Sequence, residues 1–173
     1  EEGMTGYNSE CPVDAWMQEK WPCGKDDKGN YLGYFGRGAK QLSYNFNYGP
    51  FSEAIYGDVN VLLENPSLVA DTWLNLASAI FFFVYPQPPK PSMLHVIDGT
   101  WQPNAVDSAA GITKGFGVTI NVINGGIECG AGAEGKGQPL NRIAYYEKFA
   151  EYFGVSIDPD EQLDCIDQTP FSK

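Results

Sequence analysis

Positive charge is scarce in this sequence of 173 residues. Lysine and arginine together number 11, against 22 aspartates and glutamates, so the net charge is −11, and the basic residues form no run. Nucleic acids and anionic membranes both need a basic surface on their partners, so we expect neither as a partner. A neutral polymer would be neither attracted nor repelled by this net charge.

Long hydrophobic runs are also missing. The most apolar run, from Ala77 to Tyr85, is far too short to cross a membrane. The chain opens at Glu1-Glu2-Gly3 without a leader pattern, so we expect a soluble protein that has already been processed. Disorder is not expected, because 43% of the residues are hydrophobic and 14% are aromatic. The length suits one domain with its own core.

Only one histidine, His95, and four cysteines occur, at positions 11, 23, 129 and 165. Because zinc spacing is absent, disulfides are favoured over a metal site, although four buried free thiols remain an alternative. Three pairings are possible, and proximity favours Cys11–Cys23 and Cys129–Cys165. Disulfides imply secretion, or a lysosomal or vacuolar lumen. No Gly-Lys-Ser/Thr phosphate loop follows the glycine runs, and we expect neither a cofactor nor a metal.

Helical patterns dominate the rest of the chain. We predict loop over residues 1–33, short helices over 40–48 and 51–56, and a long helix that starts at Asn65-Pro66 and ends before Pro86. Residues 87–91 are predicted to be a stiff extended connector, followed by a short helix through Ile97 capped by Ser92. Residues 116–127 fit a strand or a helix, and residues 130–137 a flexible loop. The last helix should run from Leu140 to Phe153, with Leu140, Ile143, Tyr146, Ala150 and Phe153 at apolar spacing, and end at Gly154.

Several conspicuous residues have ordinary structural explanations. We assign four aromatic residues to the core: Trp73, Phe81, Phe82 and Phe83. We assign four polar residues structural roles: Arg37, Asn45, His95 and Glu128. Arginines flanked by glycines often bond turn carbonyls, here around Gly36 and Gly38, and Glu128 precedes a predicted disulfide cysteine.

The stretch from Tyr34 to Pro50 is the most informative part of the sequence. It reads YFGRGAKQLSYNFNYGP and combines glycine turns, amides, a serine and aromatic rings. Amides hydrogen-bond the hydroxyl and acetamido groups of sugars, and aromatic rings cover the apolar faces of pyranoses. This composition indicates a sugar-binding site.

Collinear motifs extend over nearly the whole chain. They are Trp21-Pro22-Cys23, the stretch 34–50, Asn65-Pro66, Pro88-Pro89-Lys90-Pro91-Ser92 with His95-Val96-Ile97, Gly115-Phe116-Gly117, residues 123–130 (INGGIECG), Asn141-Arg142-Ile143 and Leu163-Asp164-Cys165. Together they resemble the glycoside hydrolase family 19 chitinases.

This resemblance implies an all-α, lysozyme-like fold with a deep cleft for β-1,4-linked N-acetylglucosamine. It favours a helix over 116–127 and supports the two nearest-neighbour disulfides. It also implies that residues 1–173 form one chitinase-like domain, N-terminally incomplete relative to the family.

The family chemistry uses two glutamates with inversion at the sugar carbon. One protonates the leaving oxygen, and the other activates water on the opposite face. The family's acid lies in a His-Glu-Thr-Thr-like helix, and no such motif occurs here. By the resemblance, Glu1 or Glu2 falls where the base should be, and Ser43 falls where a serine helps to hold the attacking water.

The resemblance also assigns substrate-binding positions. Gln41 and Asn47 match amides that contact sugar, and Arg142 matches an arginine that pairs with the catalytic carboxylates and tunes them. Phe46 departs from the pattern, since the family has tyrosine there. The remaining matches line the cleft: Trp21, Gln87, Lys90 and Asn124.

Two functions follow from these matches. In the first, the chain is part of an endochitinase whose upstream segment supplies the acid, in the same polypeptide or as a separate fragment of the same precursor. The alternative is a non-catalytic chitin-binding or lectin-like protein of defence or of a structural matrix. Both readings expect chitin, or its oligomers, as the partner.

Overall fold

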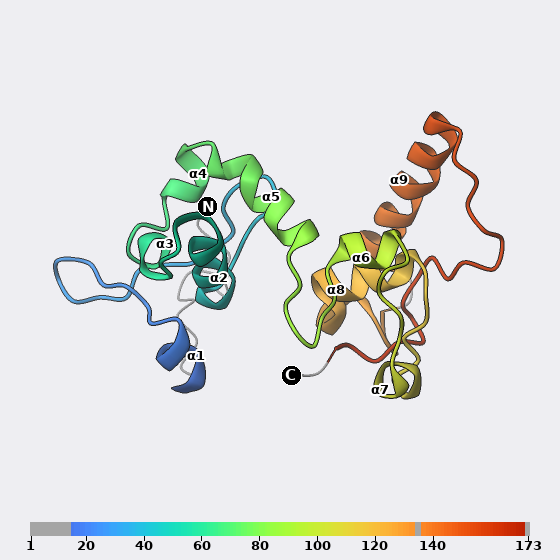
Figure 1. Ribbon diagram of the computed structural model, residues 1–173, viewed down its shortest axis with the longest axis horizontal. Coiled ribbons are helices and arrows are strands. Elements are labelled where there is room, and N and C mark those ends of the chain that lie inside the picture. The colour runs from blue at the N-terminus through green and yellow to red at the C-terminus, as the bar shows by residue number, and fades with distance from the viewer. Residues whose placement is uncertain (1–14, 134–135, 172–173) are drawn as a thin grey trace. The chain divides into compact units, whose positions relative to one another are not determined.

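The computed structural model describes residues 15–133 and 136–171 of the chain (Figure 1). Helices dominate these residues, and their only β-structure is three isolated bridges: Lys25–Tyr31, Arg37–Leu42 and Gln87–Lys90. The helices are α1 (Ala15–Lys20), α2 (Asn45–Tyr56), α3 (Asn60–Glu64), α4 (Leu68–Asp71), α5 (Leu74–Val84), α6 (Met93–Ile97), α7 (Ala105–Ala109), α8 (Phe116–Glu128) and α9 (Gly137–Phe153).

The chain divides into two compact units, unit 1 up to Phe82 and unit 2 from Phe83 onward. The assignment of residues 1–173 to one domain stays a prediction. Within the described residues, no helix has both the length and the apolar character needed to cross a membrane.

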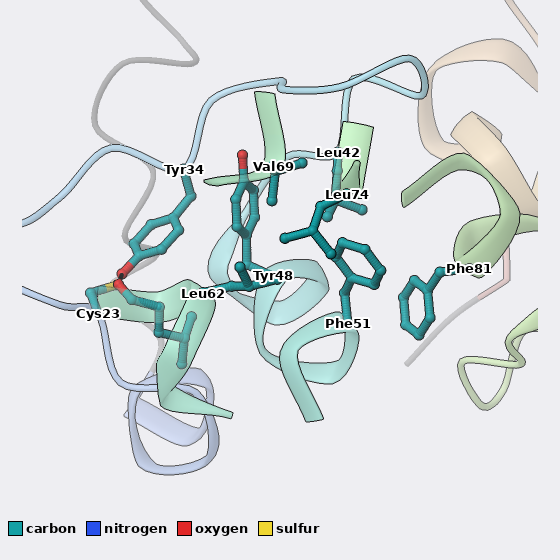
Figure 2. Close-up of a cluster of buried hydrophobic side chains, with 10 residues drawn as sticks. Cys23, Tyr34, Leu42, Tyr48, Phe51, Leu62, Val69, Leu74 and Phe81 are labelled. Carbon is teal, nitrogen blue, oxygen red and sulfur yellow. Dashed lines mark hydrogen bonds between the residues drawn. The ribbon is translucent and has the colours of Figure 1, made fainter. Parts of the chain in front are cut away.

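Unit 1 is built around aromatic side chains from α2 and the segment before it. Figure 2 shows Phe51 of α2 facing Phe81 of α5, and their ring centroids lie 5.0 Å apart. Tyr34 is fully buried, but its hydroxyl donates to the Leu63 carbonyl at 2.6 Å and accepts from the Gly24 amide at 2.7 Å. The polar group of this core residue is therefore satisfied, and each buried side chain of this size stabilises the unit by about 2–3 kcal/mol.

Helix α2 differs from the sequence prediction at both ends. Residues 40–42 are not helical, because Arg37 and Leu42 exchange two backbone hydrogen bonds of 2.9 and 3.1 Å that close a tight loop. The helix starts at Asn45 and continues through Pro50, where we had predicted a break. Proline removes one helical hydrogen bond, but the complete burial of Phe51 beside it favours the continuous helix.

The long helix predicted from Asn65 to Pro86 is two helices, α4 and α5. Asn65 ends α3, and Ser67 precedes α4. Thr72 is extended (φ −130°, ψ −176°). Its hydroxyl donates to the Leu68 carbonyl at 2.7 Å and accepts from the Leu74 amide at 3.2 Å, so it satisfies groups at both helix ends.

This break changes which aromatic side chains reach the core. Phe81 is buried and Phe82 packs against the core, which confirms two of the four core assignments. The other two are wrong, because Trp73 is 64% exposed and Phe83 is 36% exposed. The extended residue Thr72 interrupts the helix directly before Trp73, so the apolar spacing of one continuous helix does not apply there.

Unit 2 is organised around α8, which settles the helix-or-strand question for residues 116–127 in favour of a helix. Ile120 is fully buried beside the Cys129–Cys165 disulfide, which confirms that pairing. Asn121, also fully buried, donates to the Gln168 side chain at 3.1 Å and accepts from the Phe171 amide at 3.2 Å. These bonds fix the last described residues against α8.

Two connections near α8 complete the unit. Residues 87–90 do not form the predicted extended connector but a tight turn, in which the Gln87 and Lys90 backbones exchange hydrogen bonds of 2.8 and 3.1 Å. The peptide bond between Pro88 and Pro89 is cis, as in type VI turns. Ser92 caps α6 as predicted, because its hydroxyl accepts from the amide three residues on. Helix α6 contacts α8 (Figure 1).

Helix α9 begins at Gly137, earlier than predicted, and ends at Gly154 in the left-handed conformation, as predicted. It contacts α8, with Tyr146 stacked on Phe116 at 4.2 Å between ring centroids. Leu140 and Phe153, two of the residues whose apolar spacing predicted this helix, are 55% and 70% exposed. Helix α9 thus carries a second apolar side outside the core.

Candidate functional site

The loop before α2 brings predicted site residues together in unit 1. A Cβ atom on Gly36 would lie 2.7 Å from the Gln41 side-chain oxygen and 3.3 Å from the Ser43 hydroxyl. Only glycine permits this approach. The Gln41 amide nitrogen donates to the Gly38 carbonyl at 3.3 Å, and its side chain is exposed to solvent.

Backbone strain marks the same loop. Gln41 has a φ of 56° and Tyr44 a φ of 71°, and these are the non-glycine residues with positive φ among those the structure describes. Such a conformation costs a residue with a side chain about 1–2 kcal/mol. Strained residues cluster at functional sites because surrounding contacts hold them there. Here those contacts include the Tyr44 amide, which donates to the Tyr34 carbonyl at 2.8 Å.

Ser43 lies between these two residues. Its hydroxyl donates to the Gln41 carbonyl at 3.0 Å, and its own carbonyl accepts from the Asn47 side-chain amide at 2.8 Å. Because a serine hydroxyl has one proton and two lone pairs, this donation directs its proton into the protein and leaves acceptor capacity for a water or a sugar hydroxyl.

Trp21 is held against α2 by a close backbone approach. A Cβ atom on Gly49 would lie 2.2 Å from the indole ring, so the ring packs where only glycine fits. The Asn45 side chain, fully buried, donates to the Trp21 carbonyl at 2.8 Å. Asn45 is therefore structural, as predicted, and it fixes the position of a tryptophan that remains half-buried.

Aromatic rings border the loop. Tyr44 and Phe46 stack in parallel with ring centroids 5.1 Å apart, and both remain partly exposed. Arg37 lies 3.7 Å from the Phe35 ring centroid and donates to the Gly33 carbonyl at 2.8 Å. It is a structural hydrogen-bond donor, as predicted, although it bonds a different carbonyl from those around Gly36 and Gly38.

Unit 2 holds the other predicted site residues around one buried carboxylate. Glu128 has a side chain 1% exposed, and Arg142 on α9 donates to both of its oxygens, at 2.8 and 3.0 Å. The Asn124 amide donates to Oε1 at 2.9 Å. Two of the five guanidinium N–H groups are used in this pair, and the Arg142 side chain is 33% exposed, so part of the guanidinium group remains at the surface.

Gln87 and Lys90 lie in the turn that precedes α6. Both are half-buried, and the Lys90 ammonium group donates to the Val122 carbonyl of α8 at 3.0 Å. Asn124 is two residues further along α8 and has non-helical dihedral angles (φ −145°, ψ 32°), so the helix is kinked there.

The predicted site residues thus divide into two groups, one in each unit. Trp21, Gln41, Ser43 and Asn47 belong to unit 1, and Gln87, Lys90, Asn124 and Arg142 to unit 2. Glu1, Glu2 and Cys11 lie outside the described residues, so the assigned catalytic base and the Cys11–Cys23 pairing stay predictions.

Sequence reasoning treated Glu128 only as a neighbour of the disulfide. In the structure it is the acceptor that joins Asn124 to Arg142. The spacing of four residues between Asn124 and Glu128, which places both on one side of a helix, was the available signal. Among the described residues, no group of three or more potential ligands could hold a metal ion.

An all-α fold that presents amides, a serine hydroxyl, an arginine and half-buried aromatic rings is suited to binding a neutral, hydroxyl-rich ligand such as a carbohydrate. The chain belongs to glycoside hydrolase family 19: the sequence model described as Chitinase class I matches residues 6–165.

Plant chitinases are similar to this chain. It is 47% identical to Chitinase 9 of Oryza sativa subsp. japonica over 154 residues, which are 88% of the chain and 42% of the relative. It is 48% identical to Endochitinase 1 of Solanum tuberosum over 153 residues, again 88% of the chain and 44% of the relative. The chain therefore spans less than half the length of these relatives.

Solved structures agree on the fold. A family 19, class IV chitinase from Zea mays has a TM-score of 0.59 and 27% identity, over 91% of this chain and 64% of that one. A bacterial family 19 chitinase has a TM-score of 0.54 and 33% identity, over 76% and 56% of the two chains. The predicted all-α, lysozyme-like fold is thereby confirmed.

Proposed function

We propose that this chain forms the larger part of an endochitinase that hydrolyses β-1,4-linked N-acetylglucosamine polymers with inversion. The observation that carries the proposal is the strained loop of unit 1, which holds Gln41, Ser43 and Asn47 together. Maintaining positive φ at a glutamine and a tyrosine lowers stability, and such strain is typical of sites kept for function.

Each predicted site residue of unit 1 has a role in this proposal. Ser43 directs its proton to the Gln41 carbonyl, so its lone pairs accept from the attacking water and orient it. The exposed Gln41 amide and the Asn47 side chain hydrogen-bond sugar hydroxyl and acetamido groups. Trp21, packed on Gly49, covers an apolar sugar face.

The catalytic base in this proposal is Glu1 or Glu2. In an inverting hydrolase the base and the acid stand about 6.5–9.5 Å apart, so that the water fits between the base and the sugar. The acid belongs to a family motif that these 173 residues do not contain. It would be supplied by an upstream segment of the same precursor, in the same polypeptide or as a separate fragment.

Unit 2 contributes charge and hydrogen bonds. The Glu128 carboxylate fixes Arg142 and Asn124, and the guanidinium group keeps N–H groups outside this pair. We assign Arg142 to pairing with a catalytic carboxylate, since a nearby positive charge favours the ionised form. Asn124, Gln87 and Lys90 are assigned to the substrate-binding surface.

A secreted or vacuolar location fits the chemistry. The Cys129–Cys165 disulfide is stable in oxidising compartments. A chain in such a compartment can bind a polymer that lies outside the cytosol. The excess of acidic residues presents no obstacle to a neutral polysaccharide.

One observation favours a second function, a non-catalytic chitin-binding or lectin-like protein. The His-Glu-Thr-Thr-like motif that carries the family's acid is absent from this sequence. Loss of a general acid removes typically about 10²–10⁴-fold of the rate, so a chain acting without it would bind chitin and turn it over very slowly.

Incubation with a soluble N-acetylglucosamine hexamer, followed by NMR, separates these functions. The chain is tested alone and together with a polypeptide that carries the family's general-acid segment. Release of α-anomer products supports the inverting enzyme. Broadening of the sugar signals without products in either mixture supports the binding protein. The absence of both effects refutes both functions.

A further inference from the structure

We propose that Lys90 is a positioning residue, whose ammonium group holds the kink of α8 and thereby sets the direction of the Asn124 side chain. The resemblance places Lys90 at the substrate surface, but its observed hydrogen bond goes to the protein backbone. This inference rests on the proposed sugar-binding function of unit 2, and its test separates the two.

The carbonyl that Lys90 binds lies next to the kink of α8. In a regular helix the Val122 carbonyl accepts from the amide four residues later, at Gly126. Asn124 stands between these two residues and has φ −145° and ψ 32°, so the helical path is broken between this carbonyl and its regular partner. The Lys90 ammonium group lies 3.0 Å from that carbonyl oxygen. Insertion of a side chain at this place is a recognised cause of sharp helix kinks.

The charge of Lys90 suits the carbonyls at this kink. The straight part of α8 before Asn124 behaves as a helix that ends at the kink, and its last carbonyls carry partial negative charge. A cation at that end is stabilising. Val122 is 4% exposed, so its carbonyl lies where an unpaired polar group is costly and where a hydrogen bond from an ion is stronger than in water.

The backbone of Lys90 is itself held in place by hydrogen bonds. Its amide donates to the Gln87 carbonyl at 2.8 Å, and its carbonyl accepts from the Gln87 amide at 3.1 Å. The next residues, Pro91 and Ser92, are buried, and Ser92 caps α6, which contacts α8. The lysine backbone is therefore fixed relative to α8, and its side chain reaches from this fixed backbone to the Val122 carbonyl.

The kink of α8 lies at Asn124, which belongs to the proposed substrate surface of unit 2. The Asn124 amide, carried by the residue with non-helical dihedral angles, donates to Glu128 Oε1 at 2.9 Å, and the same oxygen accepts from Arg142 at 3.0 Å. A change in the kink angle would move Asn124 relative to this pair. Lys90 therefore acts on the substrate surface through Asn124, without needing to touch the sugar.

The test uses Lys90→Met, which keeps an unbranched side chain and removes the charged donor. Lys90→Arg restores a donor, and Lys114→Met, at an exposed lysine of the same unit, is the matched control. In the sugar-free chain, we expect Lys90→Met to shift the amide NMR signals of residues 122–128 and to speed their hydrogen exchange about tenfold. Lys90→Arg should recover most of the protection, and Lys114→Met should change neither.

The same variants are titrated with the N-acetylglucosamine hexamer. Lys90→Met should weaken binding about tenfold, the loss expected from removing one charge-assisted hydrogen bond, and Asn124→Ala should weaken it to a similar degree. The double variant Lys90→Met/Asn124→Ala should bind no more weakly than Asn124→Ala, because both changes act through one side chain.

Additive losses in the double variant, with unmoved α8 signals in sugar-free Lys90→Met, would overturn the proposal in favour of direct contact between Lys90 and the sugar. Shifted α8 signals with unchanged affinity would overturn the link to the site. If the unsubstituted chain binds no sugar, the proposed function fails, and the exchange measurement still decides whether Lys90 holds the kink.

Discussion

Arg142 on α9 donates two hydrogen bonds, of 2.8 and 3.0 Å, to the buried carboxylate of Glu128 at the end of α8. This bidentate pair joins two helices of unit 2. Its two members differ in exposure, since the arginine side chain is 33% exposed and the glutamate side chain 1%. The glutamate is therefore buried with its carboxylate bonded by the arginine, while part of the arginine side chain remains at the surface.

Arg142→Ala should destabilise unit 2 because it removes two charge-assisted hydrogen bonds from a buried carboxylate. We expect a loss of about 2–3 kcal/mol in the free energy of unfolding, below the value for a fully enclosed pair because the arginine is partly hydrated. Urea unfolding followed by circular dichroism measures it. Lys148→Ala, at an exposed residue of the same helix, serves as the control. A loss below about 0.5 kcal/mol for Arg142→Ala contradicts a supporting role for the pair.

Ser43→Ala should lower the rate of hexamer hydrolysis about tenfold, while the affinity for the hexamer changes little. The hydroxyl is assigned to holding the attacking water, so its loss affects the chemical step more than binding. The kcat and the hexamer Kd are measured in the mixture that shows turnover. Ser67→Ala, at an exposed serine that makes no capping bond, is the matched control. A fall in affinity as large as the fall in rate would assign Ser43 to sugar binding instead.

Gln41→Gly should increase stability and weaken sugar binding at the same time. Glycine accepts a φ of 56° without steric cost, so relief of strain offsets the greater chain entropy of glycine in the unfolded state. We expect a gain of about 0.5–1 kcal/mol in the free energy of unfolding. Gln41→Ala removes the same amide but keeps the Cβ atom, so it should bind sugar equally weakly without the gain. Equal stability of the two variants would show that the loop is not strained.

Removal of the Cys129–Cys165 disulfide should cost about 3–4 kcal/mol. The residues it joins are 36 apart in sequence, and closing a loop of that length restricts the unfolded chain by about this amount. The variant Cys129→Ser/Cys165→Ser is compared with the parent by thermal unfolding. We expect hydrogen exchange to accelerate first around Ile120, which packs against the disulfide. Unchanged thermal stability would mean that the C-terminal segment is held by its hydrogen bonds alone.

Alkaline pH should destabilise unit 1 through its buried tyrosines. Burial raises the pKa of Tyr48 above its usual value near 10, against the opposing effect of Arg37, and burial likewise raises the pKa of Tyr34. Because the folded pKa lies above the unfolded one, the stabilisation is complete below pH 10 and is lost as the pH rises through the folded pKa.

Absorbance at 295 nm, recorded with circular dichroism, tests this dependence. We expect a late ionisation phase that coincides with loss of helix, and Tyr48→Phe should reduce its amplitude. Tyr152→Phe, at a tyrosine that is 80% exposed, should leave the late phase unchanged. Complete ionisation of all tyrosines in a folded chain near pH 10 would contradict the prediction.

Particular elements show how far sequence reasoning reached. The helix stop at Gly154 and the cap at Ser92 were predictable, because each depends on one residue and its immediate neighbours. The break at Thr72 was not, since a threonine that bonds groups on both sides leaves no pattern in apolar spacing. The turn at residues 87–90 was missed because a proline-rich sequence favours extended structure as readily as a type VI turn.

The sequence by itself determined the family, the helical class and the residue types of the site, because motifs and composition are properties of the chain. It also indicated the Cys129–Cys165 pair from proximity. Only the tertiary structure decided that Glu128 is the buried partner of Arg142, and that Lys90 bonds the backbone of α8. These relationships depend on distances between segments far apart in sequence, and such distances are set by packing rather than by local pattern.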